Sequence, residues 1–297
     1  MSSEATPLQP HLIPGRIEAR AGNGHLTQLL LTSHASRAEV YLHGAHVTHF
    51  QRQGEHPLLF MSSRSSFAPG KPIRGGVPLI FPWFGPRDGA PAHGFARTAE
   101  WSLVESNATD DATRITLELT QPLDSPQWPA HRLRYRVTAD TALRLELAVT
   151  NTSATRALPC ESCLHTYFAV GDVAQARIAG FQSTRYLDKV DRFAEKIETT
   201  AEIAITGETD RVYLDTAAAV TISDPVWGRK IIVAKSGSAS TVVWNPWIAK
   251  AKAMADFGDD EYPRMLCVES GNVDRNRLTL APGATATLAV ELHSEPL

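Results

Sequence analysis

Two polar residues stand inside apolar, strand-like stretches of this 297-residue chain. His165 lies in SCLHTYFAVGDV, where the apolar stretch meets an acidic turn, and Glu269 lies in MLCVESGNV. Burying either side chain costs free energy unless it finds a partner. An imidazole and a carboxylate are also side chains that commonly transfer protons in catalysis. A histidine considered alone is more often a hydrogen-bonded structural residue, so the residues around His165 have to decide between a structural and a catalytic role.

Alternation along these stretches predicts which side chains share a face. Successive residues of a strand point to opposite faces of the sheet. In LPCESCLHTYF the residues on one face are then Glu161, Cys163, His165 and Tyr167. In MLCVESGNV, Cys267 lies on the same face as Glu269 and Val268 turns away.

The cysteines raise the question of a metal site. The donors suited to structural zinc would be Cys160, Cys163, His165 and Cys267. In a strand Cys163 and His165 point one way and Cys160 the other, and no Gly, Asn or Asp lies between the two cysteines to turn the chain. Three cysteines are also an odd count, which argues against a secreted disulfide framework. We expect reduced, buried thiols and no metal or redox centre.

The elements that must position these residues are predicted to be strands. Alternation of apolar and polar residues runs through TRITLELTQ, RLRYRVTAD, TALRLELAVTNTS and ATLAVELHS. Helical periodicity is confined to short pieces such as DDEYPRM. Many short strands separated by 19 Gly and 19 Pro predict an all-β chain folded as a large antiparallel β-sandwich. We expect a single domain over residues 1–297.

Residues 60–100 break this alternation. The segment is rich in Gly, Pro and aromatic residues, and its cationic or titratable side chains include Lys71, Arg74, His93 and Arg97. Binding residues often lie on long structured loops above a rigid sheet. We expect this segment to form such a loop.

Composition excludes several classes of function. The formal net charge is −3 and no cluster of Lys and Arg stands out, so we expect no nucleic-acid partner. The longest apolar run, VPLIFPWF, is far shorter than the roughly 20 residues of a membrane span. The N-terminal MSSEATPLQPHLIPGR has no cationic start followed by an apolar stretch, so we predict no signal peptide and a cytoplasmic protein without a membrane partner.

Several blocks together resemble a known family. In order along the chain they are GAHVTHF, KPIRGGVPLIFPWFG, AHGFARTAEW, LHTYFAVGDV, ETDRVYLD, VVWNPW and MADFGDDEYPRMLCVESGNV. They resemble the glucose-6-phosphate 1-epimerases, also called D-hexose-6-phosphate mutarotases, of the aldose 1-epimerase superfamily. The resemblance covers about residues 35–275, and the ordered set is far more specific than any single block.

The resemblance implies a galactose-mutarotase-like supersandwich with a sugar pocket. Its catalytic pair falls on His165 and Glu269, and its ligand contacts fall on Arg74, Arg97 and Asp210. Some members have Gln where this chain has Ala92, so one hydroxyl contact is absent or comes from elsewhere. Two interpretations of His93 stay open: it contacts a sugar hydroxyl or O5, or it ties the loop down. Without the family pattern, Asp210 would be interpreted as a turn former.

Anomer interconversion needs an acid and a base. The C1–O5 bond breaks, the C1–C2 bond rotates and the ring closes on the other face, while one group takes the anomeric proton and another protonates O5. Glu269 is ionised near its ordinary pKa and is the expected base; the imidazole of His165 can be charged beside carboxylates and is the expected acid. Ring closure restores both groups, so we expect no cofactor.

A phosphate on C6 would be recognised locally. Arginine offers two parallel charge-assisted hydrogen bonds to phosphate, so Arg74 and Arg97 are the main candidates and Lys71 a weaker third. Gly75 and Gly76 could present backbone N–H groups at close approach. We expect one tryptophan among Trp83, Trp244 and Trp247 to face the sugar. Asp256, Asp259 and Asp260 are interpreted as a solvated turn.

The sequence therefore predicts an isomerase, a monomer whose ligand is a small hexose 6-phosphate. It interconverts the α and β anomers of glucose 6-phosphate and related sugars, with His165 as acid and Glu269 as base. The alternatives are an epimerase of unphosphorylated aldoses and a non-catalytic sugar-phosphate-binding domain. The preferred hexose and the pathway are not determined by the sequence.

Overall fold

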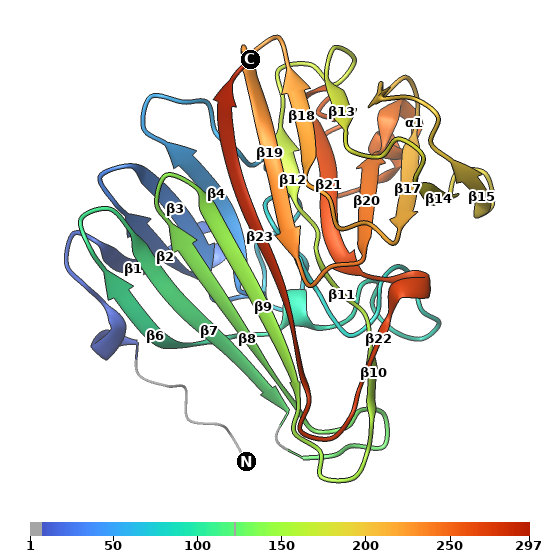
Figure 1. Ribbon diagram of the computed structural model, residues 1–297. Helices are drawn as coiled ribbons and strands as arrows, with labels where there is room; N and C mark the ends of the chain where they lie inside the picture. Colours follow the sequence, from blue (N-terminus) through green and yellow to red (C-terminus); the bar gives the residue numbers. More distant parts are fainter. Residues whose placement is uncertain (1–7, 122) are drawn as a thin grey trace.

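The computed structural model describes residues 8–121 and 123–297 and consists almost entirely of strands (Figure 1). Within these ranges there is one α-helix, α1 (Trp247–Ala253). Short 3-10 helices are η1 (Gln9–His11), η2 (Asn23–His25), η3 (Ala96–Thr98), η4 (Tyr262–Arg264) and η5 (Asp274–Asn276). The predicted all-β class is confirmed. Residues 1–7, part of the segment in which no signal peptide was predicted, lie outside the described residues.

The largest sheet has nine strands. In spatial order they are β16 (Glu202–Ile203), β13 (Arg177–Ala179), β18 (Val220–Asp224), β19 (Arg229–Ser236), β23 (Thr285–Pro296), β9 (Leu143–Asn151), β8 (His131–Ala139), β7 (Thr113–Gln121) and β6 (Ser102–Ala108). The alternating stretches of the sequence form its centre, because β7, β8, β9 and β23 each bury one side and expose the other.

The second sheet has eight strands and carries the candidate site. In spatial order seven of them are β15 (Ala194–Ile197), β14 (Arg185–Asp188), β17 (Thr209–Leu214), β20 (Ser240–Asn245), β21 (Met265–Asn272), β11 (Ser162–Leu164) and β5 (Leu79–Ile80). The eighth, β12 (Tyr167–Ala169), also pairs with β21. β21 is thus the strand on which two segments that follow Cys160 converge.

Two smaller sheets complete the fold. One contains β1 (Ile17–Ala21), β2 (Thr27–Thr32), β3 (Ser36–Tyr41) and β4 (His46–Arg52), and the other contains β10 (Leu158–Cys160) and β22 (Leu278–Leu280). The nine-stranded sheet packs against two other sheets. Its strands β7 and β8 lie against β2 and β3 of the four-stranded sheet, and β23 lies against β21 of the eight-stranded sheet (Figure 1). All strand pairs named among the described residues are antiparallel, as predicted.

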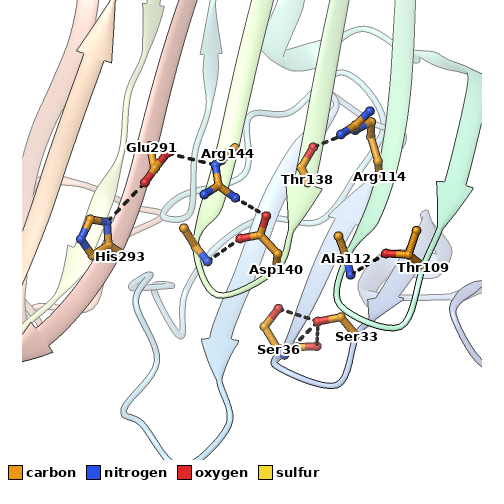
Figure 2. A network of polar contacts seen from close by, with 11 residues as sticks. Ser33, Ser36, Thr109, Ala112, Arg114, Thr138, Asp140, Arg144, Glu291 and His293 are labelled. Atoms are coloured by element: carbon orange, nitrogen blue, oxygen red, sulfur yellow. Dashed lines mark hydrogen bonds and ion pairs between the residues drawn. The ribbon is translucent and has the colours of Figure 1, made fainter.

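The outer side of the nine-stranded sheet is a polar surface. Figure 2 shows Arg144 between Asp140 and Glu291, with Arg114 donating to Thr138 on the neighbouring strand. Arg144 and Glu291 are each 43% exposed, so their ion pair contributes at most about 1 kcal/mol. Their role is to keep the outward face of the sheet in water while the inward face forms the core.

The segment 60–100 is a structured loop, as predicted, and includes only the short elements β5 and η3. Two histidines hold it: His43 Nε2 is 2.8 Å from the carbonyl oxygen of Lys71, and His46 Nε2 is 2.8 Å from that of Gly75. Gly76 has φ +59°, and a Cβ there would lie 2.2 Å from the carbonyl oxygen of Val47. The loop can therefore approach β4 only with glycine at that position.

Membrane-spanning helices are not found among the described residues: none is long and apolar enough to cross a bilayer.

Candidate active site

Strand β21 places Glu269 on the side of the eight-stranded sheet that faces away from the main core. Leu266 and Val268 belong to the core between the sheets, whereas Cys267 packs in a separate cluster with Trp244. Cys267 and Glu269 have the same parity along the strand, so they share the second face, as predicted from the sequence. Glu269 is only 1% exposed there.

His165 lies above this glutamate because two short strands flank it. Leu164 on β11 pairs with Ser270, and Tyr167 on β12 pairs with Cys267, so the residues between them cross β21 near Glu269. His165 Nε2 lies 3.3 Å from Glu269 Oε1, and His165 is 7% exposed. The structure thus brings together the two residues that the sequence singled out, 104 positions apart.

Burial shifts the two pKa values in opposite directions. It raises the pKa of the Glu269 carboxyl well above its ordinary value, and nearby Asp210 adds to this, while Lys189 and Cys163 oppose it. Burial lowers the pKa of His165 well below its ordinary value, with His93 and two arginines adding to the effect. Both shifts favour the uncharged forms. These pKa directions differ from the sequence-based expectation of a charged imidazole beside a carboxylate, because together they favour two uncharged groups that share one proton.

Tyr167 fixes the plane of the imidazole. The rings of His165 and Tyr167 stack with centroids 4.9 Å apart and an interplanar angle of 10°. The Tyr167 hydroxyl accepts a hydrogen bond of 2.9 Å from Arg74 Nη1. Among the described residues, His165 Nδ1 is buried without a hydrogen-bond partner. Ring stacking thus does the orienting that a hydrogen bond to the second ring nitrogen commonly does.

His93 ties the loop together, which was one of its two open interpretations, and its contact with a sugar stays a prediction. Its Nδ1 accepts a hydrogen bond of 3.2 Å from the Gly85 backbone N–H, which ties the loop together. Burial and the neighbouring cations lower the pKa of His93 to about 3, so the ring is neutral. Because Nδ1 accepts, the proton sits on Nε2. The ring also lies edge-on to His165, with centroids 5.6 Å apart, which makes its Nε2–H a candidate donor to a ligand beside His165 and Glu269.

Arg74 lines the pocket but already has partners. Its Nε and Nη2 donate to Asp256 Oδ2 at 3.2 and 3.0 Å, and Nη1 donates to Tyr167. The interpretation of Asp256 as part of a solvated turn is wrong, because this carboxylate is half-buried and paired. Arg74 therefore acts on His165 through Tyr167 as well as facing the cavity. Gly76 N–H donates to the Phe60 carbonyl, so it is not available to a ligand.

Arg97 is the buried cation with unused donor capacity. It is 8% exposed, its Nη2 donates to the Ala92 carbonyl at 2.7 Å, and its Nε has no partner among the described residues. Burial, with Arg74 nearby, lowers the pKa of Arg97 to about 10, so it is still cationic at neutral pH. A buried cation without a paired carboxylate is suited to bind an anion.

Asp210 lies in strand β17 and is not a turn former. Its Oδ2 lies 3.1 Å from Lys189 Nζ, and its neighbour across the ladder is Trp244. Burial raises the pKa of Asp210, and the ammonium of Lys189 opposes that shift. Lys250 on α1 adds another cation, paired with Glu208 at 2.9 Å. This edge of the pocket therefore offers both an acceptor and cations to a ligand.

These side chains surround one cavity of about 330 Å³. Its lining is Arg74, Phe84, Gly85, Pro86, Ala92, His93, Arg97, His165, Tyr167, Lys189, Asp210, Val242, Trp244, Lys250, Met254 and Glu269. All six site residues predicted from the sequence belong to it. Of the three candidate tryptophans only Trp244 does, as expected, whereas Trp83 stacks on Trp128 and Trp247 packs on Tyr262. Lys71 is exposed and does not line the cavity, contrary to its candidacy.

The cysteines do not form the zinc set considered from the sequence. Cys160 lies in the main core, whereas Cys163 and Cys267 flank Glu269 on the other side of the sheet. The donors of His165, Cys267 and Glu269 do lie within 4.8 Å of one another. Burial raises the pKa of the Cys267 thiol well above its ordinary value. Metals bind the thiolate, so we assign no metal centre to this group.

Sequence analysis missed the stacking role of Tyr167 and the presence of Lys189 and Lys250 in the pocket. Tyr167 was placed on the face of His165 by alternation, and that same parity could have suggested its stacking role. Lys189 follows strand β14 directly and carries no motif, and Lys250 lies in a seven-residue helix without a recognisable pattern. They reach the cavity only because their elements pack around it.

Comparison with known proteins agrees with this geometry. Residues 27–293 match the family described as Aldose 1-epimerase. The chain belongs to the aldose 1-epimerase family. A protein of Cenchrus ciliaris named "Putative glucose-6-phosphate 1-epimerase" is 37% identical over 274 residues, which are 87% of this chain and 82% of that protein. The resemblance inferred from the motifs, and with it the expected mutarotase-type isomerase, is confirmed.

Solved structures share the fold of this chain. The crystal structure of a "putative mutarotase" from Salmonella typhimurium superposes with a TM-score of 0.88 and 30% identity, covering 97% of this chain and 96% of that one. A galactose mutarotase-like protein from Clostridium acetobutylicum has a TM-score of 0.72 at 14% identity, covering 95% of this chain and 98% of that one, which supports the fold alone. The predicted galactose-mutarotase-like architecture is confirmed.

Proposed function

We propose that this protein interconverts the α and β anomers of glucose 6-phosphate and related hexose 6-phosphates. The observation that carries the proposal is the contact of 3.3 Å between His165 Nε2 and Glu269 Oε1 at the wall of a cavity that also holds the unpaired cation Arg97. The name of the Cenchrus ciliaris relative supports the same substrate class.

In the proposed reaction the pair exchanges protons with the sugar. Glu269 takes the proton of the anomeric hydroxyl as the C1–O5 bond breaks, and His165 delivers a proton to O5. Rotation about C1–C2 presents the other face of the aldehyde, and the reverse transfers close the ring. Each group ends the cycle in its starting state. His93 donates from Nε2 to a sugar oxygen and remains neutral throughout.

The substrate's phosphate supports the charge state that this reaction needs. In the empty pocket the cations Arg74 and Arg97 lower the pKa of His165. A bound phosphate dianion offsets these cations, so it favours the imidazolium of His165 beside the carboxylate of Glu269. The contact between Nε2 and Oε1 is the path by which the single proton changes sides. We infer that phosphate contributes to turnover as well as to affinity.

The direct test is magnetisation exchange between the α and β H1 signals of glucose 6-phosphate, with glucose measured in parallel. We expect acceleration over the uncatalysed rate for the phosphate and much less for glucose. No acceleration of either sugar by a folded protein would overturn the proposal and favour the non-catalytic binding domain.

A second candidate function is epimerisation of unphosphorylated aldoses. It is favoured by the pairing of Arg74 with Asp256 and of Lys189 with Asp210, which leaves fewer free cations than the sequence suggested. Equal acceleration of glucose and glucose 6-phosphate would support it. The acid and base pair would then stand, and the phosphate site would be discarded.

A further inference from the structure

Glu269 has only one side-chain hydrogen-bond partner besides His165 among the described residues. Cys163 Sγ lies 3.8 Å from Glu269 Oε2, within the range of a thiol hydrogen bond. Oε1 faces His165, so the two oxygens of the carboxyl have different partners. If the carboxyl group of Glu269 rotated by half a turn, Oε1 would face the thiol and Oε2 would face His165. The hydrogen bond from the thiol therefore holds the two oxygens of the candidate base in their places.

The thiol is held where it can do this. Cys163 is fully buried on β11, opposite Gly271 of β21. A Cβ at position 271 would lie 2.8 Å from Cys163 Cβ and 2.9 Å from its Sγ. The absence of a side chain at Gly271 thus makes room for the thiol, and the packed apolar cluster of Ile80, Val242 and Leu187 surrounds it.

We propose that Cys163 is a positioning residue for the reaction: its S–H donates to Glu269 Oε2 and so keeps Oε1 directed at His165 and at the sugar. In the uncharged pair this arrangement is self-consistent, because Oε1 carries the proton donated to His165 and Oε2 is the carbonyl oxygen that accepts from the thiol. A thiol is a weak donor, so it orients the carboxyl with little loss of basicity.

Burial of Cys163 and the charge of Glu269 both raise the pKa of the Cys163 thiol, so it remains a donor. The titratable groups that face this pair come from several elements. Those near Glu269 are His165, Asp210, Lys189 and Cys267; those near His165 are His93, Arg74 and Arg97; and those near Cys163 are Lys235 and Glu161. All of them are retained in the substitutions used as tests, so a change in the pH profile reports on the thiol.

The first test is spectroscopic and does not depend on turnover. The control is Cys160→Ala, because Cys160 is another buried thiol and the described residues provide no hydrogen-bond acceptor for it. Infrared difference spectra of wild type against each variant give the S–H stretch that the substitution removes. We expect the stretch of Cys163 at a lower frequency than that of Cys160. Coincident bands would overturn the proposal. This result is informative even if no sugar is turned over.

The second test is kinetic and rests on the proposed function. In Cys163→Ala, the alkaline limb of kcat/KM should move to higher pH, because the carboxylate loses a donor, and kcat should fall about two- to tenfold with KM nearly unchanged. Cys163→Ser keeps an O–H donor and should restore most of kcat, with its alkaline limb at or below that of wild type. The Cys160→Ala control should match wild type.

A purely structural role for Cys163 would give the opposite pattern. Both substitutions would then lower the free energy of unfolding and leave the limb where it is in wild type, which would overturn the proposal. If Cys163→Ala failed to fold, the frequency of the S–H band that is lost in Cys163→Ser would still decide. If neither sugar is accelerated by wild type, the proposed function fails and the infrared result stands on its own.

Discussion

At the scale of single residues, the site depends on one proton shared by a buried carboxyl and a buried imidazole. Their pKa values move toward the uncharged forms, in opposite directions, because the protein removes water from both. A pair so tightly coupled titrates as a unit. In the proposed mechanism the active form is the one with a single proton, whichever atom carries it.

The pH profile of kcat/KM should therefore be a broad bell. On the acid side activity falls when the pair takes up a second proton, and the lowered pKa of His165 places that limb below the ordinary range of histidine. On the alkaline side activity falls when the shared proton leaves, and the raised pKa of Glu269 places that limb above the ordinary range of carboxyls. Exchange rates measured across pH, corrected for the uncatalysed rate and for phosphate ionisation by ³¹P NMR, check this. An alkaline limb near pH 4.5 or an acid limb near pH 6.5 would contradict it.

Glu269→Gln should separate activity from stability. We expect a loss of turnover of at least about 100-fold, because the base is gone. The folded pKa of Glu269 exceeds its unfolded value, so the folded state holds the proton more tightly and wild type loses stability as pH rises above the unfolded value. The free energy of unfolding of wild type should fall from pH 5 to pH 8 by about 1 kcal/mol or more beyond any change in the variant. Urea denaturation at both pH values measures this, and parallel curves would contradict the assigned shift.

At the scale of elements, the site is a strand pair covered by a loop. β11 and β12 bring His165 over β21, and the segment 60–100 closes the pocket with Arg74, His93 and Arg97. The loop holds its shape through contacts to its backbone, such as His46 with the Gly75 carbonyl. Because Arg74 also donates to Tyr167, the loop controls the imidazole plane as well as the ligand contacts.

Gly76→Ala should therefore damage the site from a distance. A Cβ would meet the Val47 carbonyl at 2.2 Å with φ at +59°, so we expect a loss of about 2 kcal/mol or more in the free energy of unfolding, with reduced turnover. Gly70→Ala is the matched control, because Gly70 has φ +73° but no atom near its Cβ position, and it should lose only about 1 kcal/mol. Equal losses in the two variants would show that the close approach to β4 is unimportant.

At the scale of the whole molecule, positive charge is concentrated in one cavity although the chain has no excess of positive charge. The chain has a net charge of −3, yet four cations line one cavity. Three of them have carboxylate partners, Arg74 with Asp256, Lys189 with Asp210 and Lys250 with Glu208, which leaves Arg97 as the one without such a partner among the described residues. The proposed recognition of an anion thus rests on the folded cavity and is invisible in the overall composition.

Arg97→Gln should weaken binding of the phosphorylated sugar selectively. Loss of charge-assisted hydrogen bonds should raise KM for glucose 6-phosphate roughly 10- to 100-fold and leave any exchange of glucose unchanged. Lys71→Gln removes an exposed cation of the same loop outside the cavity and should have no effect. Equal behaviour of the two variants would indicate that phosphate binds elsewhere.

The sequence by itself determined the β class, the four long alternating strands of the nine-stranded sheet and six of the residues that line the pocket. Alternation reports burial on one face directly, and the ordered motifs identify the family. Only the tertiary structure decided the pairing of Arg74 with Asp256, the entry of Lys189 and Lys250, and the uncharged state of His165 and Glu269. These depend on contacts between residues distant in sequence and on the removal of water, neither of which leaves a local pattern.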